Sequence, residues 1–473
     1  MDAKQSGRGK KFLNDLKIYT IGNVGSKLIT FLLVPFYTYF ITDPAEFGYY
    51  DMCFTVVFCI CPFILLQLND GSFRFLIETD DRKRQAEVIT YSVNRIAVNM
   101  ILCLSLGGVV FLFGNIRYLW YVIAFAIAQA AYDDMLQTVR GLGRQRLFVL
   151  ASICNAFLIA VFSVVSVAVL RMGVAGIFIA NIASRFSMSL VMIWQLHLFR
   201  DYYGKAPVDK TVGRQLMRYC LPLLPSVLIW AFLSGNNVFF IKHFLGLEEN
   251  GIYAVLAKFT GVLYVVSQIF LQTWQQNAIE QYNSRDRDKI FSAVFNCYFY
   301  LFCGLVVFFP FVLRINYGWL VGSEYSASSQ YLFLNSLYMM CFAMSMFFDL
   351  GYQCAKQTHR SLPGIVIATC VNLAGNYFLI GILGLNGVII SGIITFLVLA
   401  VYRMADTRKY MKITFDSRNM SGVILVAISG VAYAFSGHME WDLCCIAVFS
   451  LIYVAVAPSV FKQNVISRFF SVL

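Results

Sequence analysis

Long apolar stretches recur along the whole chain and alternate with short polar links. A stretch of about 20 apolar residues crosses a hydrocarbon core of roughly 30 Å as a helix. The pattern predicts fourteen such helices, at 18–41, 48–69, 88–112, 118–139, 148–170, 173–198, 216–241, 250–276, 291–313, 328–352, 362–383, 386–402, 421–437 and 441–461. The sequence therefore predicts an all-α polytopic membrane protein with about fourteen transmembrane helices.

Two longer polar links divide these helices into groups. The link 200–214 separates six helices from the next six, and the link 403–418 precedes a final pair. We therefore expect an N-lobe with a basic tail, a C-lobe, and a last pair of helices with a short tail. Their predicted bounds are 1–199, 200–403 and 404–473.

The 37 lysines and arginines indicate an orientation. In membrane proteins these residues collect in the short loops on the cytoplasmic side. If the N-terminus is cytoplasmic, 29 of them fall inside, four fall within helices, and only Arg117, Arg171, Lys242 and Arg314 fall outside. We therefore expect both termini in the cytoplasm. The formal net charge of +12 then follows from topology and requires no nucleic-acid partner.

Composition agrees with this class and gives no sign of a metal site. The chain is 59% hydrophobic and 13% charged, with a mean hydropathy of +0.69. Its thirteen cysteines lie in or beside apolar segments without the paired spacing of a zinc site, and its four histidines do not cluster. We expect no metal and no organic cofactor.

Two short motifs occur once in each group of six helices. Glu46-Phe-Gly-Tyr-Tyr50 opens the second predicted helix, and Glu249-Asn-Gly-Ile-Tyr253 opens the eighth. Gly173-Val-Ala-Gly-Ile-Phe-Ile-Ala180 begins the sixth, and Gly384-Leu-Asn-Gly-Val-Ile-Ile-Ser391 begins the twelfth. Their matching order and spacing predict two pseudo-symmetric repeats of six helices. Because six is even, both repeats keep the same orientation in the membrane.

These motifs also carry a family resemblance. The opening GNVGSKLITFLLVPFYTYFITDPAEFGYYD, the turn with Arg74 after the second helix, the stretch NGIYAVLAKF and the G-x-x-G-[IV] helix starts resemble bacterial oligosaccharide flippases of the Wzx type. Those belong to the multidrug/oligosaccharidyl-lipid/polysaccharide exporter superfamily. The resemblance implies a V-shaped pair of six-helix lobes with two peripheral C-terminal helices. It also implies a cargo of oligosaccharide on undecaprenyl pyrophosphate, moved from the cytoplasmic to the periplasmic leaflet of the bacterial inner membrane.

Four cations fall within predicted helices: Lys27, Arg95, Arg185 and Lys258. An isolated charge in hydrocarbon costs several kcal/mol, so such residues usually face a polar cavity or a partner. A pyrophosphate cargo would require cations, and Arg74 just past the second helix is a candidate at the cavity mouth. The resemblance places the first, second, seventh and eighth helices around the cleft, which favours Lys27, Arg74 and Lys258 and gives less support to Arg95 and Arg185. Arg95 is alternatively explained by snorkelling to the nearby interface.

Asp133 and Asp134 are the only adjacent acids at membrane depth in the predicted helices. The pair is a candidate site for a coupling proton or sodium ion. The alternative, which we favour from the sequence, is that both lie at the interface and are balanced by Arg140, within two turns on the same helix.

The leading function hypothesis is a lipid-linked oligosaccharide flippase, which is not an enzyme. Its expected partners are the lipid-linked substrate and membrane lipids, with polysaccharide polymerase and export machinery as further candidates. A multidrug or organic-cation antiporter of the same superfamily is the first alternative, although its cargo would favour buried carboxylates. A membrane glycan polymerase or ligase is the enzymatic alternative, and the sequence lacks the sizeable outer loop expected for its active site.

Overall fold

The computed structural model describes residues 25, 29, 31–114, 116–206, 210–417, 419–435 and 438–461. The regular structure of these residues is helical, without a strand, which confirms the predicted all-α fold. Ten helices among them are long and apolar enough to cross a membrane, so the chain is a multi-pass membrane protein. Each of the fourteen predicted segments contains a helix, the first over the described residues Phe31–Phe40.

The chain divides into two compact units. Of the described residues, the first unit holds those up to Ile41 and those of Tyr49–Gly235, and the second holds Thr42–Gly48 and those from Asn236 onward. The chain therefore changes unit between Ile41 and Thr42, and then inside two helices, α2 (Pro44–Leu65) and α10 (Leu224–Phe244). Residues 200–235, expected in the C-lobe, group with the first unit, and the three-part division at 199 and 403 stays a prediction.

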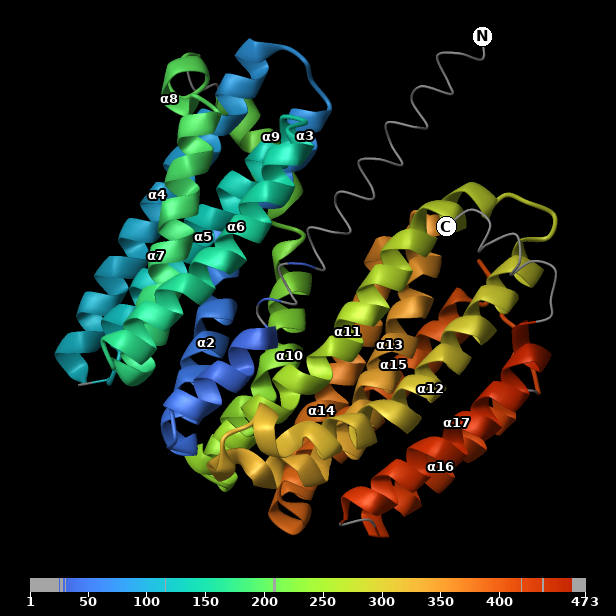
Figure 1. The fold of residues 1–473 in the computed structure, drawn as a ribbon. Coiled ribbons are helices and arrows are strands. Elements are labelled where there is room, and N and C mark those ends of the chain that lie inside the picture. Colours follow the sequence, from blue (N-terminus) through green and yellow to red (C-terminus); the bar gives the residue numbers. More distant parts are fainter. Residues whose placement is uncertain are drawn as a thin grey trace. The chain divides into compact units, whose positions relative to one another are not determined.

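The helices of the first unit follow one another with short connections (Figure 1). After α2 they are α3 (Leu68–Ile77), α4 (Arg82–Phe113), α5 (Leu119–Gly141), α6 (Gln145–Ser163), the π-helical turn η1 (Val164–Val169), α7 (Gly173–Gln195), α8 (Leu198–Asp201) and α9 (Lys210–Cys220). Helix α7 packs against α5 and α6, and α3 packs against α5. Helices α2 and α3 are separated by Leu66 and Gln67, whose φ angles of 48° and 60° are left-handed. Just before this break, the Asn99 amide of α4 donates to the Ile64 carbonyl at 2.8 Å.

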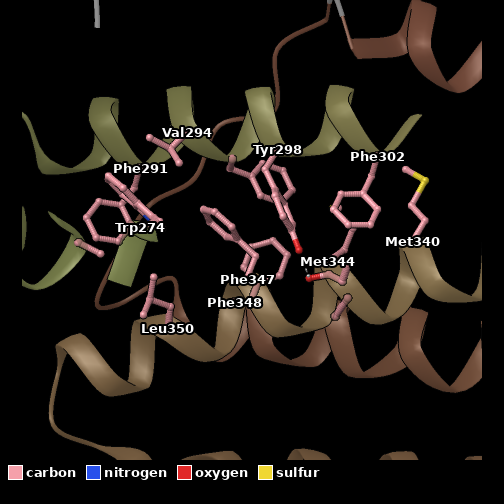
Figure 2. Packing of buried hydrophobic residues seen from close by; sticks show 14 of the residues in the cluster. Trp274, Phe291, Val294, Tyr298, Phe302, Met340, Met344, Phe347, Phe348 and Leu350 are labelled. Carbon is pink, nitrogen blue, oxygen red and sulfur yellow. Dashed lines mark hydrogen bonds between the residues drawn. The ribbon is translucent and has the colours of Figure 1, made fainter. Parts of the chain in front are cut away.

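The second unit is built around α11 to α15. Its elements are the end of α10, α11 (Leu247–Gln281), α12 (Arg287–Leu320), the 3-10 helix η2 (Ser323–Tyr331), α13 (Leu332–Cys354), the 3-10 turn η3 (Thr358–Arg360), α14 (Ser361–Leu383), α15 (Leu385–Thr407), α16 (Asn419–Phe435) and α17 (Met439–Phe461). Figure 2 shows part of its aromatic core, in which Tyr298 of α12 lies against Phe347 of α13. The Tyr298 hydroxyl is satisfied by Ser267 at 2.6 Å. Helices α16 and α17 pack on α12.

Two arginines, one buried and one half-buried, join helices of the second unit. Arg403, expected in a polar link, lies within α15 and is only 2% exposed. Its guanidinium contacts Asp349 of α13 at 2.9 Å and donates to the Ser345 carbonyl at 2.9 Å and to the Ser361 hydroxyl at 3.0 Å. These bonds tie α13, α14 and α15 together. Arg314, expected in an outer loop, lies within α12 and donates through Nε to Asp442 of α17 at 2.8 Å.

The glycines of the repeated motifs perform matching structural roles. Gly173 and Gly384 have φ angles of 55° and 58°; Gly173 is the first residue of α7, and Gly384 immediately precedes α15. An added Cβ at Gly176 would meet the η1 backbone at 3.0 Å, and one at Gly387 would lie 2.3 Å from a carbonyl of α14. Both motifs therefore start a helix that presses directly on the preceding one, as repeats should.

The other pair of motifs meets face to face within the second unit. An added Cβ at Gly48 would lie 2.1 Å from the Leu247 carbonyl oxygen, and one at Gly251 would lie 1.9 Å from the Pro44 carbonyl oxygen. The Asn250 amide donates to the Gly48 carbonyl at 2.7 Å. The starts of α2 and α11 therefore touch backbone to backbone.

Candidate functional site

A cavity of about 400 Å³ lies inside the first unit. Its walls come from α2, α5, α7, α10 and the residues around the break between α2 and α3. Most of the wall is apolar, and it includes the aromatic rings of Phe54, Phe58, Phe125 and Trp230. The polar lining residues are Gln67, Asn69, Gln129, Asp133 and Arg185. Apolar walls with a few convergent polar groups are typical of small-molecule sites.

Helical spacing explains why these polar side chains converge. Phe125, Gln129 and Asp133 follow one another at four-residue intervals on α5, so they share one face of that helix. Asn181 and Arg185 have the same spacing on α7. Because α5 and α7 pack together, the two polar faces meet. Along each helix, the residues between these polar positions are mostly apolar, as a membrane-spanning helix requires.

A hydrogen-bonded chain joins Asp133 to Arg185. The Gln129 amide nitrogen donates to both carboxylate oxygens of Asp133 at 2.9 Å. The Arg185 Nε donates to the Gln129 amide oxygen, and its Nη1 donates to the Asn181 side-chain oxygen at 2.7 Å. A carboxylate only accepts and a guanidinium only donates, so one glutamine serves both. The guanidinium also lies over the Phe125 ring, 4.8 Å from its centre.

This arrangement places one negative and one positive charge on a single cavity wall. In a medium of low dielectric constant, an uncompensated charge is far more costly than a pair. Asp133 and Arg185 therefore stabilise each other's charged forms through the bridging amide. Arg185 was predicted to serve a cavity, and the structure places it on the cavity wall.

The two adjacent aspartates occupy different environments. Asp133 lines the cavity, whereas Asp134 is 3% exposed and its Oδ1 has no hydrogen-bond partner among the described residues. Arg140, their expected counter-charge, has its guanidinium over the Phe73 ring at 4.4 Å. The position of Asp133 favours a role toward a ligand or ion, and a coupling role for the pair stays a prediction.

The other predicted cations of the first unit lie away from this cavity. Arg74 is exposed on α3 and pairs with Glu78 at 3.0 Å. Arg95 is exposed on α4, on the same side as the exposed Val98 and Leu102 one and two turns further on. That placement favours snorkelling from a lipid-facing surface over a cavity role. Lys27 lies outside the described residues.

Lys258 belongs to the second unit. It lies eleven residues into α11, roughly 16 Å from the start of that helix by helical rise. Its ammonium is 5.2 Å from the centre of the buried Phe47 ring, which in turn contacts the Tyr325 ring. The structure therefore brings Arg185 and Asp133 together in one unit and places Lys258 in the other.

Several polar residues were not singled out from the sequence. Gln129 and Asn181 carry no charge. The sequence signal for them is that Gln129 lies four residues before Asp133 and Asn181 four residues before Arg185. A second group is a buried cluster of four asparagines from α10 and α14. There the Asn376 amide nitrogen lies 3.0 Å, 2.8 Å and 3.2 Å from the side-chain oxygens of Asn236, Asn237 and Asn372. In the sequence, this cluster is marked only by the occurrence of asparagines within apolar helices.

Comparison with known proteins fits this description. Residues 12–275, more than half of the chain, match the family described as polysaccharide biosynthesis protein. No curated protein matches the sequence closely. The lipid II flippase MurJ in an inward closed conformation shares the fold with a TM-score of 0.72 and 12% identity, over 94% of this chain and 98% of that one.

Multidrug transporters share the fold as well. An inward-facing MATE family transporter of the MOP superfamily aligns with a TM-score of 0.66 and 14% identity, over 83% of this chain and 98% of that one. A mutant of the Vibrio cholerae MATE transporter VcmN aligns with a TM-score of 0.56 and 13% identity, over 85% and 97%. The family match and the shared fold agree with the resemblance expected from the sequence.

Proposed function

Because this chain belongs to the polysaccharide biosynthesis protein family, we propose that it is a flippase for lipid-linked oligosaccharides. Its cargo would be an oligosaccharide repeat unit on undecaprenyl pyrophosphate, moved from the cytoplasmic to the periplasmic leaflet of the bacterial inner membrane. The protein would work by alternating access and would perform no covalent chemistry. Both termini would lie in the cytoplasm, as the distribution of basic residues indicates.

The polar cavity in the first unit is the observation that supports this function most. Arg185 lies twelve residues into α7, roughly 18 Å along a helix of about 35 Å. A charge at that depth, hydrogen-bonded and facing a cavity, is costly to maintain and typically marks a substrate or ion pathway. A passive membrane anchor would have no use for it.

The remaining predicted cations suit the anionic part of the cargo. Lys258 is the described candidate for the pyrophosphate, and Lys27 is the second. Arg74, on the exposed surface of α3, is a candidate for first contact with the lipid's phosphates, where it would exchange Glu78 for the ligand. Such an exchange costs little, because exposed ion pairs contribute about 0–1 kcal/mol.

A deletion strain provides the direct test. Loss of the protein should cause the lipid-linked oligosaccharide to accumulate on the cytoplasmic side and should abolish surface polysaccharide. Restoring the wild-type chain should reverse both effects, whereas Arg185→Ala should restore neither at equal membrane abundance. Phe186→Ala is the matched control, because Phe186 is the next residue on α7 and its side chain is 57% exposed. Normal surface polysaccharide in the deletion strain would refute the proposal.

An organic-cation antiporter is the second candidate, and one observation favours it. Asp133 puts a carboxylate beside aromatic rings in the cavity, which is a suitable environment for an organic cation. Uptake of ethidium into inverted vesicles, driven by an imposed ion gradient, separates the two candidates. Ethidium uptake that depends on Asp133, with normal polysaccharide export in the deletion strain, would favour the antiporter.

A further inference from the structure

The charges of the first-unit cavity do not suit the pyrophosphate of the proposed cargo. Arg185 is already matched by Asp133 through Gln129, so the wall carries no net charge. An entering pyrophosphate would meet the Asp133 carboxylate at short range. Two like charges a few ångströms apart repel each other in a medium of low dielectric constant. The cavity therefore fits a polar ligand without net charge.

The unpaired atoms of the wall specify the hydrogen bonding of that ligand. The Asn69 side-chain oxygen is buried and has no hydrogen-bond partner among the described residues. Each Asp133 oxygen has lone pairs left after accepting from Gln129. These atoms require hydrogen-bond donors, which hydroxyl and amide groups supply and an ionised phosphate does not.

We propose that this cavity binds one uncharged sugar ring of the lipid-linked cargo and does not bind its pyrophosphate. This inference rests on the proposed flippase function and deepens it. The Asp133 carboxylate and the Asn69 oxygen accept from the sugar's hydroxyl groups, and Arg185 keeps free N–H groups to donate to its ring or hydroxyl oxygens. The aromatic rings of Phe54 and Trp230 cover the apolar C–H faces of the sugar.

Size and backbone conformation support a binding role. A volume of about 400 Å³ lies toward the small end of ligand pockets, about 300–1,000 Å³, and accommodates one ring but not a whole repeat unit. Gln67, which lines the cavity, has a left-handed backbone conformation, and so does its neighbour Leu66. Non-glycine residues in that conformation are strained, and such strain is concentrated at ligand sites.

In this proposal, the sugar and the pyrophosphate of the cargo are recognised by different residues. The first-unit cavity recognises one sugar, and the pyrophosphate is bound by residues outside this cavity. A flippase built this way binds undecaprenyl pyrophosphate without a glycan more weakly than the complete cargo, although that lipid has the same charge and the same tail.

The test compares two ligands on the purified full-length protein in detergent. One is the lipid-linked oligosaccharide extracted from the deletion strain, and the other is undecaprenyl pyrophosphate without a glycan. The glycan should improve the dissociation constant by about tenfold or more, the ratio that one or two hydrogen bonds to charged groups provide. In Gln129→Leu and Trp230→Ala this ratio should fall toward one, with the affinity for undecaprenyl pyrophosphate unchanged. Phe186→Ala should retain the wild-type ratio.

The possible outcomes are distinguishable. Equal affinity of the wild type for both ligands, or an equal loss for both ligands in Gln129→Leu and Trp230→Ala, would overturn the sugar site and leave the flippase function standing. Failure of the wild type to bind either lipid would overturn the proposed function itself. If Gln129→Leu does not fold, as judged by gel filtration, Trp230→Ala and the milder Gln129→Asn decide the question.

Discussion

The buried contacts of Arg403 lead to a quantitative stability prediction. Arg403→Met keeps the length and apolar bulk of the side chain but removes the ion pair with Asp349 and both other guanidinium hydrogen bonds. Breaking a buried ion pair from one side costs about 3–5 kcal/mol. Asp349 is 26% exposed and still accepts from Ser361 at 2.7 Å, so we expect the lower end, about 3 kcal/mol.

A second substitution separates the ion pair from simple packing. Asp349→Leu in the Arg403→Met background removes the stranded carboxylate, so the double variant should regain about half of the loss or more, because apolar replacement of both partners is often neutral. Arg403→Lys should be intermediate. A lysine cannot reach three acceptors with the geometry of a guanidinium fork.

Thermal unfolding of the purified protein in detergent measures these effects. The buried cysteines Cys341 and Cys354 lie on α13, the helix of Asp349, and a thiol-reactive fluorophore will report the exposure of these and the other buried cysteines on unfolding. At about 2–4 °C per kcal/mol for a unit of this size, Arg403→Met should lower the midpoint by about 6–12 °C. A shift of less than about 2 °C, or a double variant less stable than Arg403→Met, would refute the reasoning.

Three further predictions follow from charge, topology and packing. Among substitutions of Lys258, export per folded molecule should be highest for Arg, lower for Ala and lowest for Glu. Glu adds a repulsion of about 1–4 kcal/mol to the lost attraction. Equal export by the Ala and Glu variants would exclude Lys258 from the cargo site. In a cysteine-free background, a cysteine at Lys83 should resist an impermeant thiol reagent in intact cells and one at Ser326 should react, and the reverse pattern would reject the orientation. Gly251→Ala should lower folded yield severely, because its Cβ would lie 1.9 Å from a backbone carbonyl, whereas Gly261→Ala on the same helix, with open space around it, should fold normally.

The extent of the helices was predictable because apolar length alone decides what can cross a membrane. The exact ends of the helices were harder to predict. The predicted helix 386–402 stops at the first charge, but α15 continues to Thr407 because Arg403 is neutralised by Asp349 on another helix. Such pairing between helices leaves no spacing signal in the sequence.

The sequence identified the charged residues Asp133 and Arg185 but not the contacts that join them. Arg185 was expected to face a cavity and does line one. The sequence suggested Arg140 as the balance for Asp133, because it lies on the same helix. The structure instead joins Asp133 to Arg185 through Gln129, an uncharged residue whose role depends on how α5 packs against α7.

The contact between Gly48 and Gly251 joins equivalent positions of the two repeated motifs. In a symmetric homodimer, the same residue of each copy meets its counterpart at the two-fold axis. Gly48 and Gly251 occupy equivalent places in the two repeats, and each would clash with the other's helix if it gained a side chain. Their neighbours differ, since Phe47 lies against Lys258 whereas its counterpart Asn250 donates to the Gly48 carbonyl. The flanking positions of the two motifs can therefore differ, whereas the close backbone contact leaves room only for glycine at both Gly48 and Gly251.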